Sequence, residues 1–405
     1  MRHGTSLVAT RKSAWAGCLL LLLTGGILEA SPESRRLTGE AYGLAYDLRL
    51  EDSLALLSRA RAADPADPAP PRAAAAVTWL QILCTQGVAT FAAFEGTATG
   101  DVVARPPVPE SLRTRFMTEI EASIALAERA RGVTRDDADA QYQLGASLGL
   151  RALYRGSVEG RAFAAFTEGR KAVALLDDLR RRSPRHHESA LLPGIYRYAV
   201  STLSLPKRWL AAAAGLPGDR AGGIALLEQA ARDDAATATD ASVVLMIVYN
   251  REGRRSDALR HLRTLHRRHP TNRLLRLNLA ATELAAADGA AAERSIDEGL
   301  SRPTPFGEPF IPGERGLWLY IRGAARVLLG NTAAARADLH EALDAQPREW
   351  IRARVHVELA KVALASGSRA GASAELDRAV LHARRASDET ALTMARNLRR
   401  TNGNR

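Results

Sequence analysis

The chain has 405 residues, of which 46% are hydrophobic, 25% are charged and only 5% are aromatic. This composition excludes a disordered polymer, and the low aromatic content with abundant alanine favours close-packed helices over a β-sandwich or barrel. The formal net charge is +11, and the basic residues are almost all arginines because only four are lysines. Arginine and alanine are also the residues that a GC-rich genome enriches, so this charge is weak evidence for a polyanionic partner.

Residues 1–30 have the order of a secretory signal. Three Arg or Lys residues precede a short uncharged stretch that contains five consecutive leucines, and small residues follow. The stretch is shorter than the ~20 residues that span a bilayer. We therefore expect a signal peptide cleaved after Ala30 or Gly26, with an uncleaved anchor as the alternative. Either form predicts export to the periplasm or cell envelope of a bacterium, and cleavage leaves Cys84 as the only cysteine.

Residues 31–237 carry a loose pattern of paired helices. The candidate units are 34–67, a pair running from Arg72 to Phe94 and from Pro109 to Arg131, 138–184, and 204–237. The third of these has about 15 residues more than a standard unit, which predicts longer helices.

Residues 238–386 repeat with a period of 34 residues. The four units in register are 239–272, 273–306, 316–349 and 353–386, and an insertion at 304–313 separates the second from the third. Such a period predicts stacked helix pairs.

The unit 316–349 shows why the pattern has these residue types. Gly323 lets the second helix approach the first, and Leu339 fills the space between the two helices. Gly330 ends the first helix in a conformation with positive φ, and Pro347 stops the second helix.

These recurring glycines, alanines and prolines resemble the tetratricopeptide repeat superfamily. The resemblance implies an all-α fold, a right-handed superhelical solenoid of about eight helix pairs, and a role in protein–protein interaction. A narrower similarity covers Leu192 to Glu228, where Gly194, Tyr196, Gly218 and Gly223 stand in order. This stretch resembles a eukaryotic tetratricopeptide family that includes a mitochondrial outer-membrane protein linked to clearing inclusions.

In this superfamily the first helix of each unit lines the concave surface and contacts ligands through its second, fifth, ninth and twelfth positions. The resemblance therefore places the following residues there: Asp240, Val243, Ile247, Asn250, Leu274, Leu277, Ala281, Leu284, Leu317, Tyr320, Ala324, Val327, Arg354, Val357, Lys361 and Leu364. Asn278 falls on a position of the Lys/Asn clamp that holds a peptide carboxylate in chaperone-binding members. The surrounding positions are apolar, which argues against such a clamp and favours a hydrophobic peptide, an amphipathic helix or part of the chain itself.

Residues 387–405 are expected to form a capping helix and a tail. Ala391, Met394, Ala395 and Leu398 fall on one face of this helix, which would cover the end of the array.

One motif has a catalytic interpretation, and two histidine clusters have a metal-binding one. Residues 145–149 match G-x-S-x-G around Ser147, but this motif needs a strand–turn–helix context, and helix packing explains the two glycines better. His186 and His187 lack companions with metal-site spacing, and His266 and His269 fit the last turn of a helix, where the dipole favours cations. The sequence contains no P-loop, H-E-x-x-H or C-x-x-C motif, so we expect no enzyme, metal or cofactor.

The densest basic run is 180–182 with Arg185. Asp177 and Asp178 dilute its charge, and no aromatic residues alternate with the arginines, so nucleic acid is not an expected partner.

Two functional hypotheses follow. The first is an exported, non-catalytic scaffold that binds protein or peptide partners in its concave groove. The alternative is a peripheral envelope protein that contacts lipid through its arginine-rich face and the apolar insertion containing Pro305, Phe306, Pro309 and Phe310.

Overall fold

The computed structural model describes residues 30–87, 106–134, 136–203, 217–232, 237–301 and 311–403, together with residues 205, 208, 212 and 215. The secondary structure of these residues is entirely helical, with 17 α-helices and one short 3₁₀ helix. The fold is therefore all-α, as the composition and the repeats predict.

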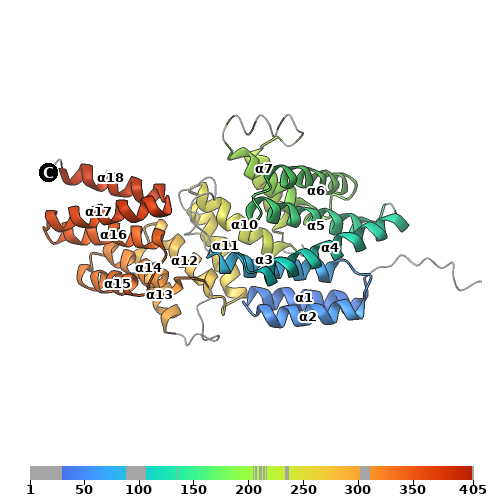
Figure 1. The fold of residues 1–405 in the computed structure, drawn as a ribbon, viewed down its shortest axis with the longest axis horizontal. Helices are drawn as coiled ribbons and strands as arrows, with labels where there is room; N and C mark the ends of the chain where they lie inside the picture. The colour runs from blue at the N-terminus through green and yellow to red at the C-terminus, as the bar shows by residue number, and fades with distance from the viewer. Residues whose placement is uncertain are drawn as a thin grey trace, which may run out of the picture.

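The helices follow one another as pairs along an elongated molecule (Figure 1). The N-terminal pairs are α1 (Pro32–Tyr46) with α2 (Leu50–Ala63), α3 (Ala69–Thr85) with α4 (Glu110–Val133), α5 (Ala138–Ser157) with α6 (Ala162–Arg182), and α7 (Leu191–Ser201) with α9 (Arg220–Ala230); η2 (His187–Ala190) precedes α7. The C-terminal pairs are α10 (Ala238–Arg251) with α11 (Arg255–Arg268), α12 (Arg273–Ala285) with α13 (Gly289–Leu300), α14 (Glu314–Leu328) with α15 (Thr332–Asp344), and α16 (Glu349–Ala365) with α17 (Arg369–Ala386). The last helix is α18 (Glu389–Gly403).

The most extensive contacts join the two helices of each pair and then each pair to the next. First helices of neighbouring pairs also meet, as α1 meets α3, α12 meets α14, and α14 meets α16. Among the described helices, no comparable contact joins the second helices of neighbouring pairs. The stack is solenoid-like, and we call the side formed by the first helices the inner face.

In two distant units, a glycine in the first helix of a pair lets the second helix pack closely against it, as expected. A Cβ atom on Gly323 would lie 2.8 Å from Leu339 Cδ2, and one on Gly145 would lie 2.8 Å from Leu176 Cδ2. Both leucines are fully buried beside a fully buried alanine, Ala335 or Ala172. The same packing unit is therefore built twice, and Gly145 serves helix packing.

The turn after the first helix also repeats. Gly253, Gly330 and Gly367 have φ of +72°, +80° and +76°, and Ala287 stands at the same register with φ +61°. An alanine pays a steric cost in this left-handed region that glycine avoids.

Two expected helix boundaries were wrong. The helix expected to reach Phe94 ends at Thr85, because Gly87 turns the chain with φ +65°; Phe94 itself lies outside the described residues. In the other case, the first helix of the pair assigned to 204–237 is α7, which precedes that range, and Leu210 and Ala211 lie outside the described residues. Gly223 permits this pairing, since its Cβ would lie 2.7 Å from Tyr198 N.

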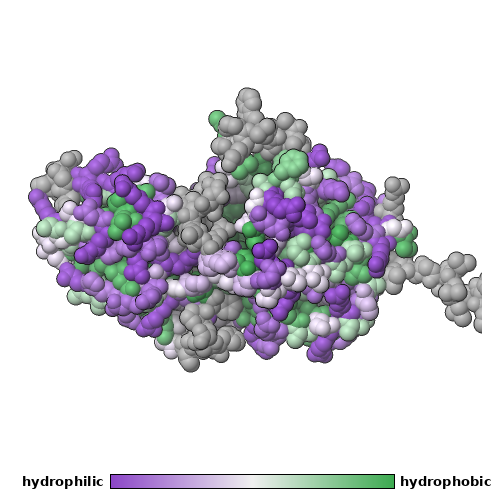
Figure 2. Space-filling view, in the orientation of Figure 1, coloured by the Kyte–Doolittle hydropathy of each residue, from purple (hydrophilic) through white to green (hydrophobic). Residues whose placement is uncertain are grey.

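The remaining boundaries lie close to the expected ones. Helices α5 and α6 have 20 and 21 residues, so the additional residues of the 138–184 unit lengthen its helices. Helix α18 packs on α16 and α17 through fully buried Ala391 and Ala395, with Met394 and Leu398 half-buried beside them. On the face shown in Figure 2, hydrophilic residues are interspersed with hydrophobic ones over both halves of the molecule.

We predict that Gly323→Ala destabilises the protein by about 1–3 kcal/mol, because the new methyl group overlaps Leu339. Gly39→Ala is the matched control: Gly39 lies in α1, where an added methyl group meets nothing within 4 Å beyond its own helix, so helix propensity should make the change neutral or stabilising. Urea unfolding followed by circular dichroism measures both. Equal effects of the two substitutions would contradict the packing role of Gly323.

We further predict that Ala287→Gly stabilises the protein by about 0.5–1 kcal/mol, because it relieves a positive φ at an alanine. The reciprocal Gly330→Ala should destabilise by about 1–2 kcal/mol. Thermal unfolding of the two variants tests the shared register, and a fall in Tm for Ala287→Gly would refute it.

Candidate functional site

Most of the expected contact residues of α12 and α14 are buried in the structure. Leu274, Leu277, Leu317 and Tyr320 are 1–8% exposed and belong to one apolar cluster. Leu48, at the α1–α2 turn, and Cys84, near the end of α3, belong to the same cluster, with Leu80 packed against it. N-terminal side chains therefore cover this part of the inner face.

Hydrogen bonds adjoin the apolar cluster and join the end of α1 to α10, to the C-terminal cap of α11 and to the N-terminal cap of α12. The Tyr46 hydroxyl donates to the Asp240 carboxylate, and Asn272 Nδ2 donates to the Tyr46 carbonyl at 2.6 Å. His269 Nδ1 lies 3.0 Å from Asp47 Oδ1. These contacts tie the end of α1 to residues more than 190 positions away in the chain.

A further contact lies at the end of α3. Arg348 Nη1 donates to the Gln86 carbonyl at 2.6 Å. We call these four polar contacts, together with the burial of Leu48 and Cys84, the N-terminal closure. It depends on side chains, because among the described helices α1–α3 make no contact with α10–α16 as extensive as those between consecutive helices.

A cluster of charged and aromatic groups adjoins the closure. Arg72 Nε donates to Gln143 Oε1 at 2.7 Å, and the Arg72 guanidinium lies 5.5 Å from the centre of the Tyr142 ring. Burial raises the pKa of the Asp240 carboxyl, while the Tyr46 hydrogen bond and the Arg72 charge oppose that rise. These groups come from α1, α3, α5 and α10, so they hold the first helices of distant pairs together.

The two asparagines among the expected contact residues are committed to their own chain. Asn250 is 2% exposed and its Nδ2 donates to Thr282 Oγ1 at 3.0 Å. Asn278 is 4% exposed and its Nδ2 donates to the Leu274 carbonyl at 2.9 Å. Both amides are therefore buried and hydrogen-bonded within the chain.

Another part of the inner face stays accessible. Six apolar side chains on four successive first helices are half-buried rather than buried: Val243, Ile247, Ala281, Leu284, Val327 and Leu364. All six occupy positions that the repeat register assigned to the concave surface. We call them the inner stripe.

The serine motif lies in a helix. Ser147 is in the interior of α5, is 0% exposed, and its Oγ lies 2.8 Å from Ser123 Oγ. A Cβ on Gly149 would overlap the Leu192 side chain, so both glycines of the motif permit close packing. The strand-to-helix turn that would expose this serine is not formed at this position.

The histidines contact separate partners. His269 is the C-terminal cap residue of α11, but its side chain reaches Asp47, a contact that helix capping does not anticipate. His266 Nε2 lies 3.1 Å from Arg276 Nη2. Within the described residues, no group of three or more His, Cys, Asp or Glu side chains is arranged to hold a metal ion.

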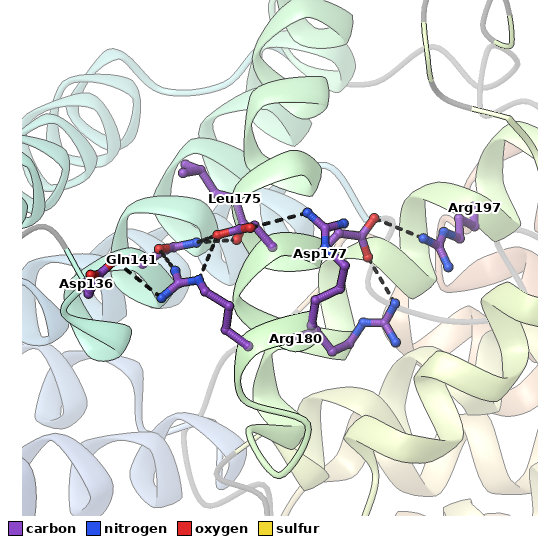
Figure 3. A network of polar contacts seen from close by, with 9 residues as sticks. Asp136, Gln141, Leu175, Asp177, Arg180 and Arg197 are labelled. Carbon is purple, nitrogen blue, oxygen red and sulfur yellow. Dashed lines mark hydrogen bonds and ion pairs between the residues drawn. The ribbon is translucent and has the colours of Figure 1, made fainter.

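The basic run forms a network of ion pairs and hydrogen bonds, in which ion pairs join α6 to α7 and Gln141 of α5 contributes hydrogen bonds (Figure 3). Asp177 accepts from Arg180 at 3.2 Å and from Arg197 at 2.9 Å. Asp178 pairs with Arg181 at 3.3 Å and with Arg182 at 3.1 Å. Much of the run's charge is therefore neutralised within the fold.

Two features bear on membrane contact. No described helix combines the length and apolarity needed to cross a bilayer. The insertion residues Pro305, Phe306, Pro309 and Phe310 lie outside the described residues, as does the expected signal in residues 1–29.

No protein-family model matches the chain, and a comparison with curated proteins found no match. The functional argument therefore rests on the geometry of the inner face.

Cys84 is a natural reporter of the closure. Its thiol is 4% exposed, and burial raises its pKa, so both access and ionisation limit its reaction with thiol reagents. We predict slow labelling of the native protein and roughly five- to tenfold faster labelling of Asn272→Asp, which keeps the α12 cap acceptor but loses the hydrogen bond to Tyr46.

Asp288→Asn is the matched control, because Asp288 caps α13 in the same way, by accepting from Ala291 N at 3.0 Å. Its labelling rate should equal that of the unmodified protein. Equal rates in all three proteins would show that the hydrogen bond to Tyr46 does not limit access to Cys84.

Proposed function

We propose that this protein is an exported, non-catalytic tetratricopeptide-type scaffold that binds a protein or peptide partner on its inner face. The proposal includes a right-handed superhelical arrangement of the helix pairs. The recurring Gly–Leu packing and the positive-φ turns at one register support it. The burial of Ser147 within α5 supports a non-catalytic role for that segment.

The observation that carries the proposal is the inner stripe. Ile247, Leu284, Val327 and Leu364 come from α10, α12, α14 and α16, and each remains half-buried. Leu284, Val327 and Leu364 hold the same register position on α12, α14 and α16, whereas Ile247 lies one turn earlier in its unit. Because α14 contacts both α12 and α16, the three equivalent side chains form a continuous track. Such a track suits the apolar face of an amphipathic segment.

The N-terminal closure limits how much of the inner face a partner reaches. Side chains of the N-terminal helices cover four residues of this face: Leu274, Leu277, Leu317 and Tyr320. A partner on the inner stripe therefore contacts these residues only if α1–α3 move away. The thin, side-chain-based contact makes such movement less costly than separating a helix pair.

The alternative, peripheral lipid contact through the arginine-rich face, receives less support. Arg180, Arg181 and Arg182 are each paired with Asp177 or Asp178. Paired charges attract an anionic surface less than free ones do.

The test is binding of a labelled, uncharged amphipathic helical peptide, followed by fluorescence anisotropy. The purified protein should bind it with an affinity that salt leaves nearly unchanged, and Leu284→Glu should weaken binding roughly ten- to hundredfold through the loss of about 1.5–3 kcal/mol of apolar contact. Leu381→Glu is the control, because this leucine is 49% exposed on α17, a second helix.

Absence of peptide binding, or equal weakening by both substitutions, would reject the inner stripe as the binding surface. Binding to anionic liposomes that disappears in high salt would favour the lipid alternative instead.

A further inference from the structure

A separate crevice lies away from the inner face. Helices α4 and α6, the second helices of neighbouring pairs, form its walls together with α5, and its volume is about 660 Å³. None of its residues belongs to the inner stripe or to the N-terminal closure. Its volume falls within the range of ligand-binding sites.

The crevice carries excess positive charge. Four cations line it, Arg131, Arg151, Arg155 and Lys171, against two carboxylates, Glu128 and Glu168. Arg151 and Arg155 both pair with Glu168, which is 7% exposed. One carboxylate thus serves two guanidinium groups.

The other two cations lack an anionic partner among the described residues. Arg131 and Lys171 form no ion pair there, and the Nε atoms of Arg131 and Arg155 are buried without a hydrogen-bond acceptor. The helix dipole explains a cation at Arg131, because this residue lies in the last turn of α4. The dipole does not explain a cation at Lys171, because this residue lies in the middle of α6.

Apolar surface accompanies these charges. Phe163 lines the crevice and is 85% exposed, although aromatic side chains are usually covered. Leu144, Leu148 and Leu175 also line it. The crevice therefore offers an apolar contact beside unpaired cations.

We propose that this crevice is a second binding surface, which takes an acidic peptide segment carrying apolar side chains. The carboxylates of such a segment would pair with the Arg131 guanidinium and the Lys171 ammonium group. Its apolar side chains would cover Phe163. An amphipathic helix lying between α4 and α6 presents both groups on neighbouring faces.

The probe is a short labelled amphipathic peptide of leucine and glutamate, with the lysine analogue as the counter-probe. The purified protein should bind the acidic peptide and not the basic one, with affinity that falls as salt rises. Lys171→Glu and Arg131→Glu should each weaken binding roughly tenfold at low salt. Phe163→Ser should weaken binding without removing its salt dependence.

The matched control is Arg369→Glu, which makes the same change in charge at an exposed residue at the start of α17, far along the chain. It should bind like the unmodified protein. Circular dichroism and an unchanged Cys84 labelling rate show that each variant remains folded.

Equal binding of the acidic and basic peptides overturns the proposal, as does equal weakening by Lys171→Glu and Arg369→Glu. Preferential binding to phosphatidylglycerol vesicles that Lys171→Glu abolishes overturns it in favour of a lipid. Because Leu284→Glu leaves every crevice residue in place, this result is independent of peptide binding at the inner stripe.

Discussion

The structure depends on close contact between the two helices of each pair. Gly145 and Gly323 leave room for Leu176 and Leu339 at the same distance, although the two units are far apart in the chain. Close-packed interiors tolerate little extra volume, so this contact sets where a glycine is needed. Once the pairs form, their remaining apolar faces are buried by stacking, which produces the solenoid-like arrangement.

Stacking then creates two kinds of surface. The inner face combines a buried part, covered by Leu48 and Cys84, with the half-buried inner stripe. Where the second helices diverge, α4 and α6 leave a crevice over α5. The inner surface is mainly apolar and the crevice has surplus positive charge, so the two proposed sites select segments of different chemistry.

The N-terminal closure bears on the dynamics of the inner face. Its polar contacts involve few residues, among them Tyr46, Asp47 and Asn272, and they join described helices that share no extensive helix–helix contact. Opening the closure therefore costs less free energy than separating the two helices of a pair. Binding on the inner face and release of α1–α3 would therefore be coupled.

The sequence by itself determined most of the helix pairs, the glycines at two helix crossings and the positive-φ turn at Gly330, because these depend on contacts within one repeat period. It also placed Leu274 and Leu284 on the same side of α12, but not that one is buried and the other half-buried. Only the tertiary structure decided that difference, together with the pairing of His269 with Asp47. The stacking of many pairs brings together residues that are far apart in the chain, and the local sequence carries no sign of such a partner.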